Sequence, residues 1–164
     1  MRYYYCYLLK MLREREHDPK EFGKIAQDIV AIDLKLCGHK ILEYSLVGKS
    51  DIETEFKGDR YVFQVKSSEK LSEINVRQIK DELKAKIGKK ILIFFDISFP
   101  ARLMCFDLDN LPNANIIPVF KEDKLSEDLN KNLSKAVQRY YEFYKQYYRA
   151  EYARKLVKNF IGTS

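Results

Sequence analysis

Residues 50–68, SDIETEFKGDRYVFQVKSS, hold two carboxylates, an amide and a lysine at spacings that suit chemistry. Two short runs of strand-forming residues flank residues 57–60, KGDR, which are typical of a hairpin turn. Directly opposed and alternate residues of a hairpin share a face. With Gly58 and Asp59 at the centre of the loop, four polar side chains project from one face in opposed pairs: Asp51 with Lys66, and Glu53 with Gln64.

The other face of this hairpin is apolar enough to belong to a core. It carries the side chains of Ile52, Phe56, Tyr61, Phe63 and Val65. A slip of one residue would place Val65 among the charged side chains, so the pattern itself favours this register.

The polar face of the hairpin has a chemical interpretation and a structural one. Carboxylate oxygens bind Mg²⁺, a hard cation that keeps several waters. A lysine beside such a metal can orient a water, or help to deprotonate it, for attack on phosphorus. The structural alternative is a solvated strand face with cross-strand salt bridges, which are common and contribute little stability.

The same residues resemble a known nuclease family. Gly48-x-x-Asp51-Ile52, a turn, and then VFQVK at residues 62–66 resemble the core of the PD-(D/E)XK nuclease superfamily. The Gln-x-Lys variant is most similar to the Mrr-type restriction endonucleases. The layout is also similar to archaeal Holliday-junction resolvases, which usually carry Glu in place of this Gln.

The resemblance implies roles for individual residues. Asp51 would bind a divalent metal, Mg²⁺ or Mn²⁺, Gln64 would complete the metal site, and Lys66 would position the attacking water. Related nucleases often carry a metal-linked Glu on a preceding helix, in a pattern like G-x-x-x-E, and here that position is Gln27. Glu53 is the expected replacement for the missing carboxylate, as an accessory metal ligand.

Asp33 is a second accessory candidate, and it has a structural alternative. At 100° per residue it falls near the middle of the buried face of a helix expected at residues 18–37. A carboxylate in that position needs a partner or a function. An internal salt bridge is the favoured interpretation of Asp33.

Composition sets wider bounds. The chain has 164 residues, 46% hydrophobic and 33% charged, as expected for one globular domain, and its net charge of +6 favours polyanionic partners. Three widely spaced cysteines without a C-x-x-C motif argue against structural zinc and a disulfide framework. Because no apolar run is long enough to span a membrane and no secretion signal is recognisable, a cytoplasmic protein is expected.

Hydrophobic periodicity and turn signals divide the chain into elements. Helices are expected at 2–16, 18–37 and 72–87, with a long helical segment at 126–160. Besides the hairpin, strands are expected at 39–47, 90–97, 103–106 and 116–120. Asp18 and Pro19 start the second helix, and Ser72 is the expected cap of the third.

This element order predicts an α/β fold, a mixed β-sheet flanked by helices with a long C-terminal helix, in a single domain over residues 1–164. The resemblance covers residues 18–120 and implies that the sheet is of the restriction-endonuclease-like type.

Two features point to partners. Basic residues around the 72–87 helix are expected to contact DNA phosphates: Lys70, Arg77, Lys80 and Lys84. Near Ala150 the apolar stripe of the last helical segment changes phase, which leaves Tyr152, Leu156 and Phe160 without an obvious place in a monomer core. A homodimer that cuts both strands of a duplex is therefore expected.

The leading hypothesis is a Mg²⁺-dependent endonuclease that hydrolyses DNA phosphodiester bonds. The main alternative, motivated by Gln27, is a DNA-binding or assembly module that keeps the nuclease fold without its chemistry. A third interpretation has no nucleic acid, and the Tyr-rich C-terminal helix binds a protein partner.

Overall fold

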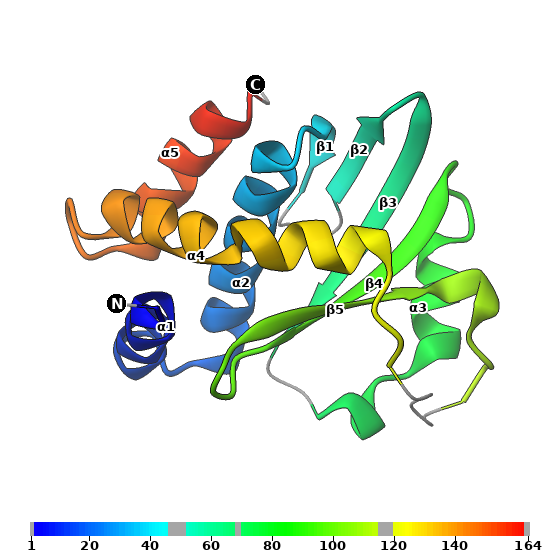
Figure 1. Ribbon diagram of the computed structural model, residues 1–164, viewed down its shortest axis with the longest axis horizontal. Helices are drawn as coiled ribbons and strands as arrows, with labels where there is room; N and C mark the ends of the chain where they lie inside the picture. Colours follow the sequence, from blue (N-terminus) through cyan, green and yellow to red (C-terminus); the bar gives the residue numbers. More distant parts are fainter. Residues whose placement is uncertain (1, 46–51, 68–69, 115–119, 163–164) are drawn as a thin grey trace.

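The computed structural model describes residues 2–45, 52–67, 70–114 and 120–162. A five-stranded mixed sheet lies between helices on both of its faces, which confirms the expected α/β class (Figure 1). The strands are β1 Lys40–Tyr44, β2 Ile52–Phe56, β3 Asp59–Lys66, β4 Lys89–Asp96 and β5 Arg102–Asp107. The helices are α1 Tyr4–Arg15, α2 Pro19–Leu36, α3 Val76–Leu83, α4 Lys124–Tyr144 and α5 Ala150–Ile161, with 3-10 turns η1 Leu71–Glu73 and η2 Leu108–Asn110.

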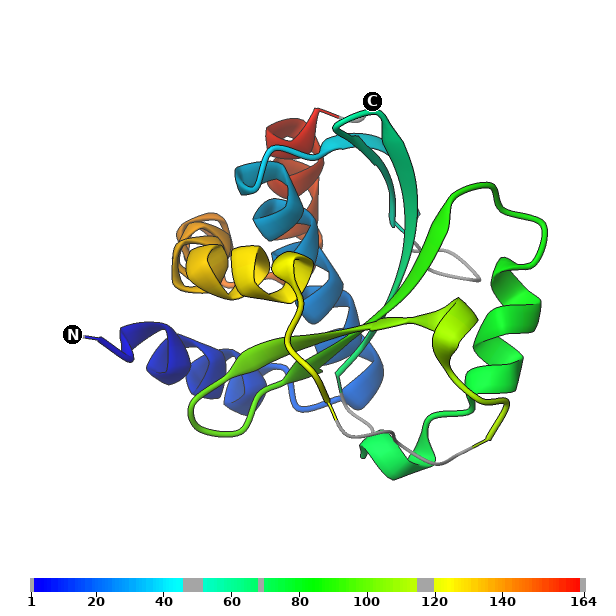
Figure 2. The ribbon, with the colours of Figure 1, turned by 45° about the vertical axis from the view of Figure 1, so that its right-hand side comes forward.

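The strands follow one another across the sheet in chain order, β1-β2-β3-β4-β5. Among the strands that the structure describes, only β3 and β4 run parallel, and their connection passes through η1 and α3. The other neighbouring strands are antiparallel. In Figure 2, α1, α2, α4 and α5 cover one face of the sheet and α3 lies on the other.

Each face of the sheet has its own core. Ile52, Phe63 and Ile93 belong to the larger core beneath α2 and α4. Val62 and Leu92, each next to one of these residues in the chain, belong to the smaller core beneath α3. This alternation follows from the pleat of a strand, and it places the even-numbered residues of β3 on the α3 face.

Helix α2 begins as the sequence predicts. The side chain of Asp18 accepts a hydrogen bond from the backbone N–H of Lys20 at 3.0 Å, and Pro19 occupies the first turn. Just after the helix Gly38 has a φ of +96°, a conformation that glycine adopts without steric cost. Both signals were visible in the sequence.

The register of the hairpin differs from the predicted one by two residues. Phe56 pairs with Asp59 and Glu53 pairs with Val62, so the loop is Lys57-Gly58. Both loop residues have positive φ, 52° and 83°, as in the type I′ turn that suits a two-residue hairpin. Because a shift of two residues preserves side-chain alternation, Glu53, Gln64 and Lys66 still share one face.

The third helix starts later than predicted. Asn75, not Ser72, is its N-cap, and the Asn75 side chain accepts from the backbone N–H of Gln78 at 3.0 Å. Ile74, immediately before this cap, is extended and buried in the α3-side core. The burial of Ile74 thus separates the 3-10 turn η1 from α3.

The C-terminal helical segment is two helices. Its first stripe is buried as predicted, from Leu129 to Tyr144 in α4, and the chain then breaks at residues 145–149, where Tyr148 has a φ of 52°. Helix α5 buries Ala153, Val157 and Ile161. Of the strand predicted at 116–120, residues 116–119 lie outside the described residues, and Phe120 has no regular secondary structure.

Candidate metal site on the β2–β3 hairpin

Gln64 and Lys66 lie on β3, in the middle of the sheet. In the parallel pairing Gln64 is opposite Leu92 and Lys66 is opposite Phe94 of β4. Alternation places both side chains on the α3 face with Val62. Gln64 is only 6% exposed, whereas Lys66 is half-buried.

The amide oxygen of Gln64 is the notable atom of this site. Oε1 is buried, and among the described residues it accepts no hydrogen bond. A buried amide oxygen without a donor costs about 1–3 kcal/mol, so such atoms call for an explanation. A hard cation is one partner that an amide oxygen can take.

Asp51, the principal expected metal ligand, lies outside the described residues. The residue that follows it, Ile52, is fully buried and pairs with Phe63, the residue before Gln64. Ile52, the first described residue of the hairpin, therefore lies opposite the residue that precedes Gln64.

Glu53 is engaged in ion pairs. One carboxylate oxygen lies 3.3 Å from Nη2 of Arg60 and the other lies 3.2 Å from Nζ of Lys86, and the residue is 3% exposed. Burial alone would raise the pKa of Glu53, but hydrogen bonds with Glu43, Lys86 and Arg60 outweigh it and lower the pKa. A metal ion bound at Glu53 would have to displace one of these cations.

Glu43 is a member of this cluster that the sequence analysis missed. It is the direct cross-strand partner of Glu53, because the β1–β2 register shifts between Ile41 and Glu43 and leaves Leu42 as an extra residue. The available signal was a charged residue inside the otherwise largely apolar strand at 39–47.

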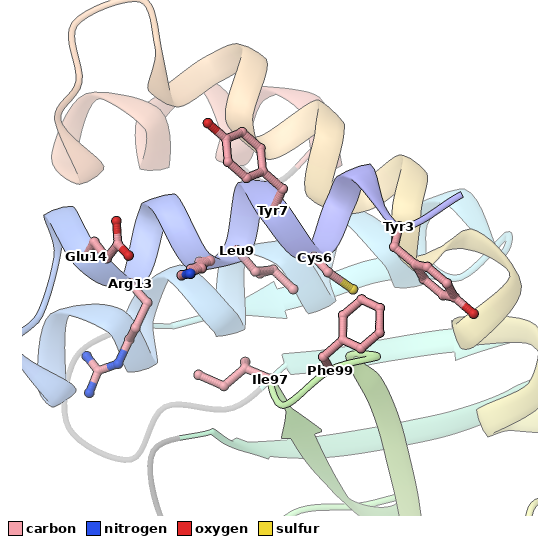
Figure 3. Close-up of a pocket in the computed structure, with 9 residues that line it drawn as sticks. Tyr3, Cys6, Tyr7, Leu9, Arg13, Glu14, Ile97 and Phe99 are labelled. Carbon is pink, nitrogen blue, oxygen red and sulfur yellow. The ribbon is translucent and has the colours of Figure 1, made fainter. Parts of the chain in front are cut away.

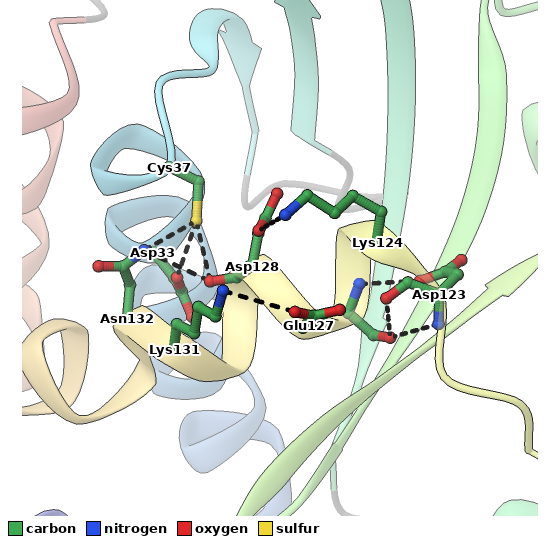
Figure 4. A network of polar contacts seen from close by, with 9 residues as sticks. Asp33, Cys37, Asp123, Lys124, Glu127, Asp128, Lys131 and Asn132 are labelled. Atoms are coloured by element: carbon green, nitrogen blue, oxygen red, sulfur yellow. Dashed lines mark hydrogen bonds and ion pairs between the residues drawn. The ribbon is translucent and has the colours of Figure 1, made fainter.

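Gln27 and Asp33, the accessory candidates on α2, lie apart from the Gln64 face. Nε2 of Gln27 donates to the backbone oxygen of Ser45, at the end of β1, at 3.3 Å. Asp33 faces α4, where its Oδ1 lies 3.5 Å from Sγ of Cys37, and Asn132 donates to the same sulfur (Figure 4). The structure does not bring Asp33 to the hairpin.

The salt bridge predicted at Asp33 is wrong within the described part of the chain. The partner of its carboxyl group is a thiol, and no cation within the described ranges forms an ion pair with it. Burial raises the pKa of Asp33 well above its usual range, and raises that of Cys37 to about 12. A contact between a carboxyl group and a thiol therefore takes the place of the expected ion pair.

The four predicted phosphate contacts are not equivalent. Lys70, Arg77 and Lys84 are exposed, on and beside α3. Lys80 is half-buried, and its Nζ donates to the backbone oxygen of Leu111 at 2.5 Å. The ammonium of Lys80 therefore links α3 to the loop after η2.

A second polar cluster, far from the hairpin motif, was also missed. Asp28 of α2 is fully buried and accepts a hydrogen bond from the hydroxyl group of Tyr44. Its other oxygen faces Arg154 of α5. No motif in the sequence marks this cluster, because its members come from elements far apart in the chain.

Within the described ranges, no three His, Cys, Asp or Glu side chains are grouped so that they could hold a metal ion. In the same part of the chain, no helix combines the length and apolar character that crossing a bilayer requires. Comparisons of the chain with models of protein families, with curated proteins and with solved structures found no match.

Proposed function

We propose that the chain is a Mg²⁺-dependent endonuclease that hydrolyses DNA phosphodiester bonds, with a restriction-endonuclease-like fold. The observation that carries the proposal is the buried amide oxygen of Gln64, which has no donor among the described residues. It lies on the same strand and face as Lys66, in the order that the Gln-x-Lys resemblance implies.

In this proposal each residue has a separate task. Asp51 and Gln64 would hold the metal through a carboxylate and an amide oxygen, which fits a hard cation that keeps several waters. The metal, Mg²⁺ or Mn²⁺, would supply Lewis acidity at the phosphate. Lys66 orients the water whose oxygen attacks phosphorus as a P–O bond of the DNA backbone breaks. No covalent enzyme intermediate is involved.

Glu53 has a modified role in this scheme. The positive charges of Arg60 and Lys86 already neutralise its carboxylate. It therefore stabilises the hairpin and acts as an accessory ligand only if Lys86 or Arg60 moves away.

The proposal extends to partners and location. DNA phosphates would contact Lys70, Arg77 and Lys84 on the α3 side of the sheet, which is also the side of Gln64. Two copies would associate through α5, where Tyr152 and Leu156 are half-buried. Such an enzyme would act on DNA in the cytoplasm.

Plasmid nicking against a Mg²⁺ series tests the proposal. Asp51→Asn keeps the shape of the side chain but removes its charge, and Lys66→Ala removes the ammonium, so both should reduce nicking to background. Glu55→Gln and Lys40→Ala are matched controls at exposed positions of β2 and β1, and should cut as the wild type does. Wild-type activity in Asp51→Asn would refute the metal site.

A catalytically lapsed nuclease fold that still binds DNA is the second candidate. The bonded amide of Gln27 and the ion pairs of Glu53 favour it, since neither group is a free carboxylate. This candidate predicts duplex binding without cleavage at any Mg²⁺ concentration. If Gln64→Glu cleaved DNA and the wild type did not, the catalytically lapsed nuclease fold would be the supported candidate.

A further inference from the structure

A groove of about 510 Å³ runs between α1 and the turn that joins β4 to β5. Figure 3 shows Cys6 and Leu9 pointing down from α1 toward Ile97 and Phe99, which form the opposite wall. The volume is within the range of about 300–1,000 Å³ that is typical of ligand sites. Helix α1, which forms one wall of the groove, lies on the face of the sheet opposite α3 (Figure 2), whereas Gln64 shares the α3 face with Val62.

Exposed aromatic rings line this groove. Phe99 is 71% exposed and Tyr3 is 39% exposed, which is unusual for residues of their size. Tyr3 meets Phe99 edge to face, with ring centroids 4.9 Å apart and planes at 67°. This contact supports the Phe99 ring from one side and leaves most of its surface open to a planar partner.

Cations outnumber anions around the rings. Arg2 lies over the Tyr3 ring, and Lys10 and Arg13 line the groove, against the single carboxylate of Glu14. Arg13 is held in place, because its Nη1 donates to the backbone oxygen of His17 at 2.9 Å and its guanidinium packs over a ring of α2.

This charge favours a polyanion over a second copy of the chain. A two-fold contact through this groove would bring two copies of the same cationic surface together. An occupant with planar rings and a negative backbone satisfies both the aromatic and the cationic groups.

We propose that this groove binds single-stranded nucleic acid, with unpaired bases stacked on Phe99 and Tyr3 and the phosphates held by Lys10 and Arg13. Stacking platforms flanked by cations are a general means of binding single strands without reading sequence. Duplex is a poor occupant because its bases are already stacked on each other. The proposal does not depend on the chemistry of the hairpin.

The test is fluorescence anisotropy of labelled oligothymidylate and oligouridylate, in EDTA so that no strand is cut. Phe99→Leu keeps apolar bulk without the ring and should weaken binding about fivefold or more, whereas Phe99→Tyr should bind as the wild type does. Lys10→Gln should flatten the slope of log K against log salt by about 0.7. The two oligomers distinguish DNA from RNA as the preferred strand.

Matched controls lie outside the groove. Tyr147→Leu removes a 61% exposed ring between α4 and α5, and Lys121→Gln removes an exposed cation; both should bind as the wild type does. Wild-type affinity in Phe99→Leu, or a wild type that binds neither oligomer, overturns the proposal. So does a loss of duplex affinity in Phe99→Leu as large as its loss of oligomer affinity, or a dimer in light scattering that Phe99→Leu dissociates. Plasmid nicking stays a separate measurement, so a failure here leaves the nuclease proposal standing.

Discussion

Oδ2 of Asp28 and Nε of Arg154 lie 3.8 Å apart in the interior, where α5 packs on α2. Asp28 is fully buried, and the side chain of Arg154 is 18% exposed. Neither of these two atoms forms a hydrogen bond within the described ranges, and the buried hydroxyl group of Tyr140 is in the same condition. The attraction between the charges is therefore not accompanied by full hydrogen bonding, and the energetic cost of burying the carboxylate remains large.

Asp28 is expected to make the protein less stable as the pH rises from about 4 to about 7. Burial raises its pKa to about 7, although Tyr44 and Arg154 oppose the shift. The folded chain therefore retains a proton that the unfolded chain releases, so the stabilising effect is full below the unfolded pKa and is lost through pH 7. The unfolding free energy of Asp28→Asn, measured in urea, should change less with pH than that of the wild type. Because one pKa unit corresponds to about 1.4 kcal/mol, the two profiles should differ by a few kcal/mol across this range.

The matched control for this measurement is Asp81→Asn, at an exposed position of α3. It should keep the wild-type pH profile. An unchanged profile in Asp28→Asn would show that Asp28 is ionised in the folded chain near pH 5.

His39 is expected to act in the opposite direction. Burial lowers its pKa to about 4; its Nδ1 lies 2.7 Å from the hydroxyl oxygen of Thr54, and its ring stacks on Phe56 at 4.3 Å. The unfolded chain binds a proton more readily, so stability is full above pH 6.5 and is lost as the pH falls toward 4.

The measurement for His39 is the difference in unfolding free energy between the wild type and His39→Gln. This difference in unfolding free energy should be about 2 kcal/mol smaller at pH 5 than at pH 7, because only the wild type loses the stabilisation that comes from a neutral, buried His39. A difference that stays constant with pH would show that the imidazole is not held neutral.

Gln64→Glu is expected to lower the Mg²⁺ concentration that gives half-maximal plasmid nicking. In the proposed site a second carboxylate, added to that of Asp51, would strengthen binding of a hard cation. The nicking rate at saturating Mg²⁺ should be kept or raised. Gln78→Glu, at an exposed position of α3, is the control for an added negative charge. A higher Mg²⁺ requirement in Gln64→Glu would contradict the assignment of Gln64 as a ligand.

Duplex binding is expected to depend on Arg77 and Lys84, both exposed on the α3 side. Replacing both with Ala should reduce the slope of log K against log salt by roughly 2. Lys80→Ala should instead lower stability, because it removes the bond to the backbone oxygen of Leu111. If Lys80→Ala changed the salt slope and the double replacement of Arg77 and Lys84 did not, Lys80 would be the phosphate contact and the other two would not.

The proposed dimer is expected to dissociate in Leu156→Glu, which places a charge on the half-buried face of α5. Light scattering at micromolar concentration gives the mass. Truncation after Arg149 is not a clean test, because it also removes the buried Val157 and Ile161. A wild type that is monomeric at this concentration would contradict the dimer.

The elements that local signals specify were predictable from the sequence. Asp18-Pro19 starts α2 because a cap and a proline act within one turn; a continuous apolar run located β4, and apolar periodicity located α4. The hairpin register was missed by two residues, because Lys57 adopts a positive φ that its residue type does not favour. The N-cap at Asn75 was missed because the burial of Ile74, a tertiary contact, decides where α3 begins.

The candidate site was predictable only in part. Alternation correctly placed Glu53, Gln64 and Lys66 on one face. The ion pair between Glu53 and Lys86 was not predictable, because Lys86 arrives from 33 positions along the chain. The ion pair of Asp28 and Arg154 was not predictable for the same reason, because the packing of α5 on α2 brings these two residues together.

That packing also bears on how the protein is made. The larger core holds residues from α1 near the beginning of the chain and from α5 at its end, including Leu8 and Ile161. During synthesis the N-terminal helices therefore emerge long before the segment that closes their core. In a nascent chain that stops before Ala150, the part of α2 that α5 covers, including Asp28, lacks its cover, and exposed apolar surface of this kind is what chaperones and proteases act on until the twelve-residue helix α5 docks.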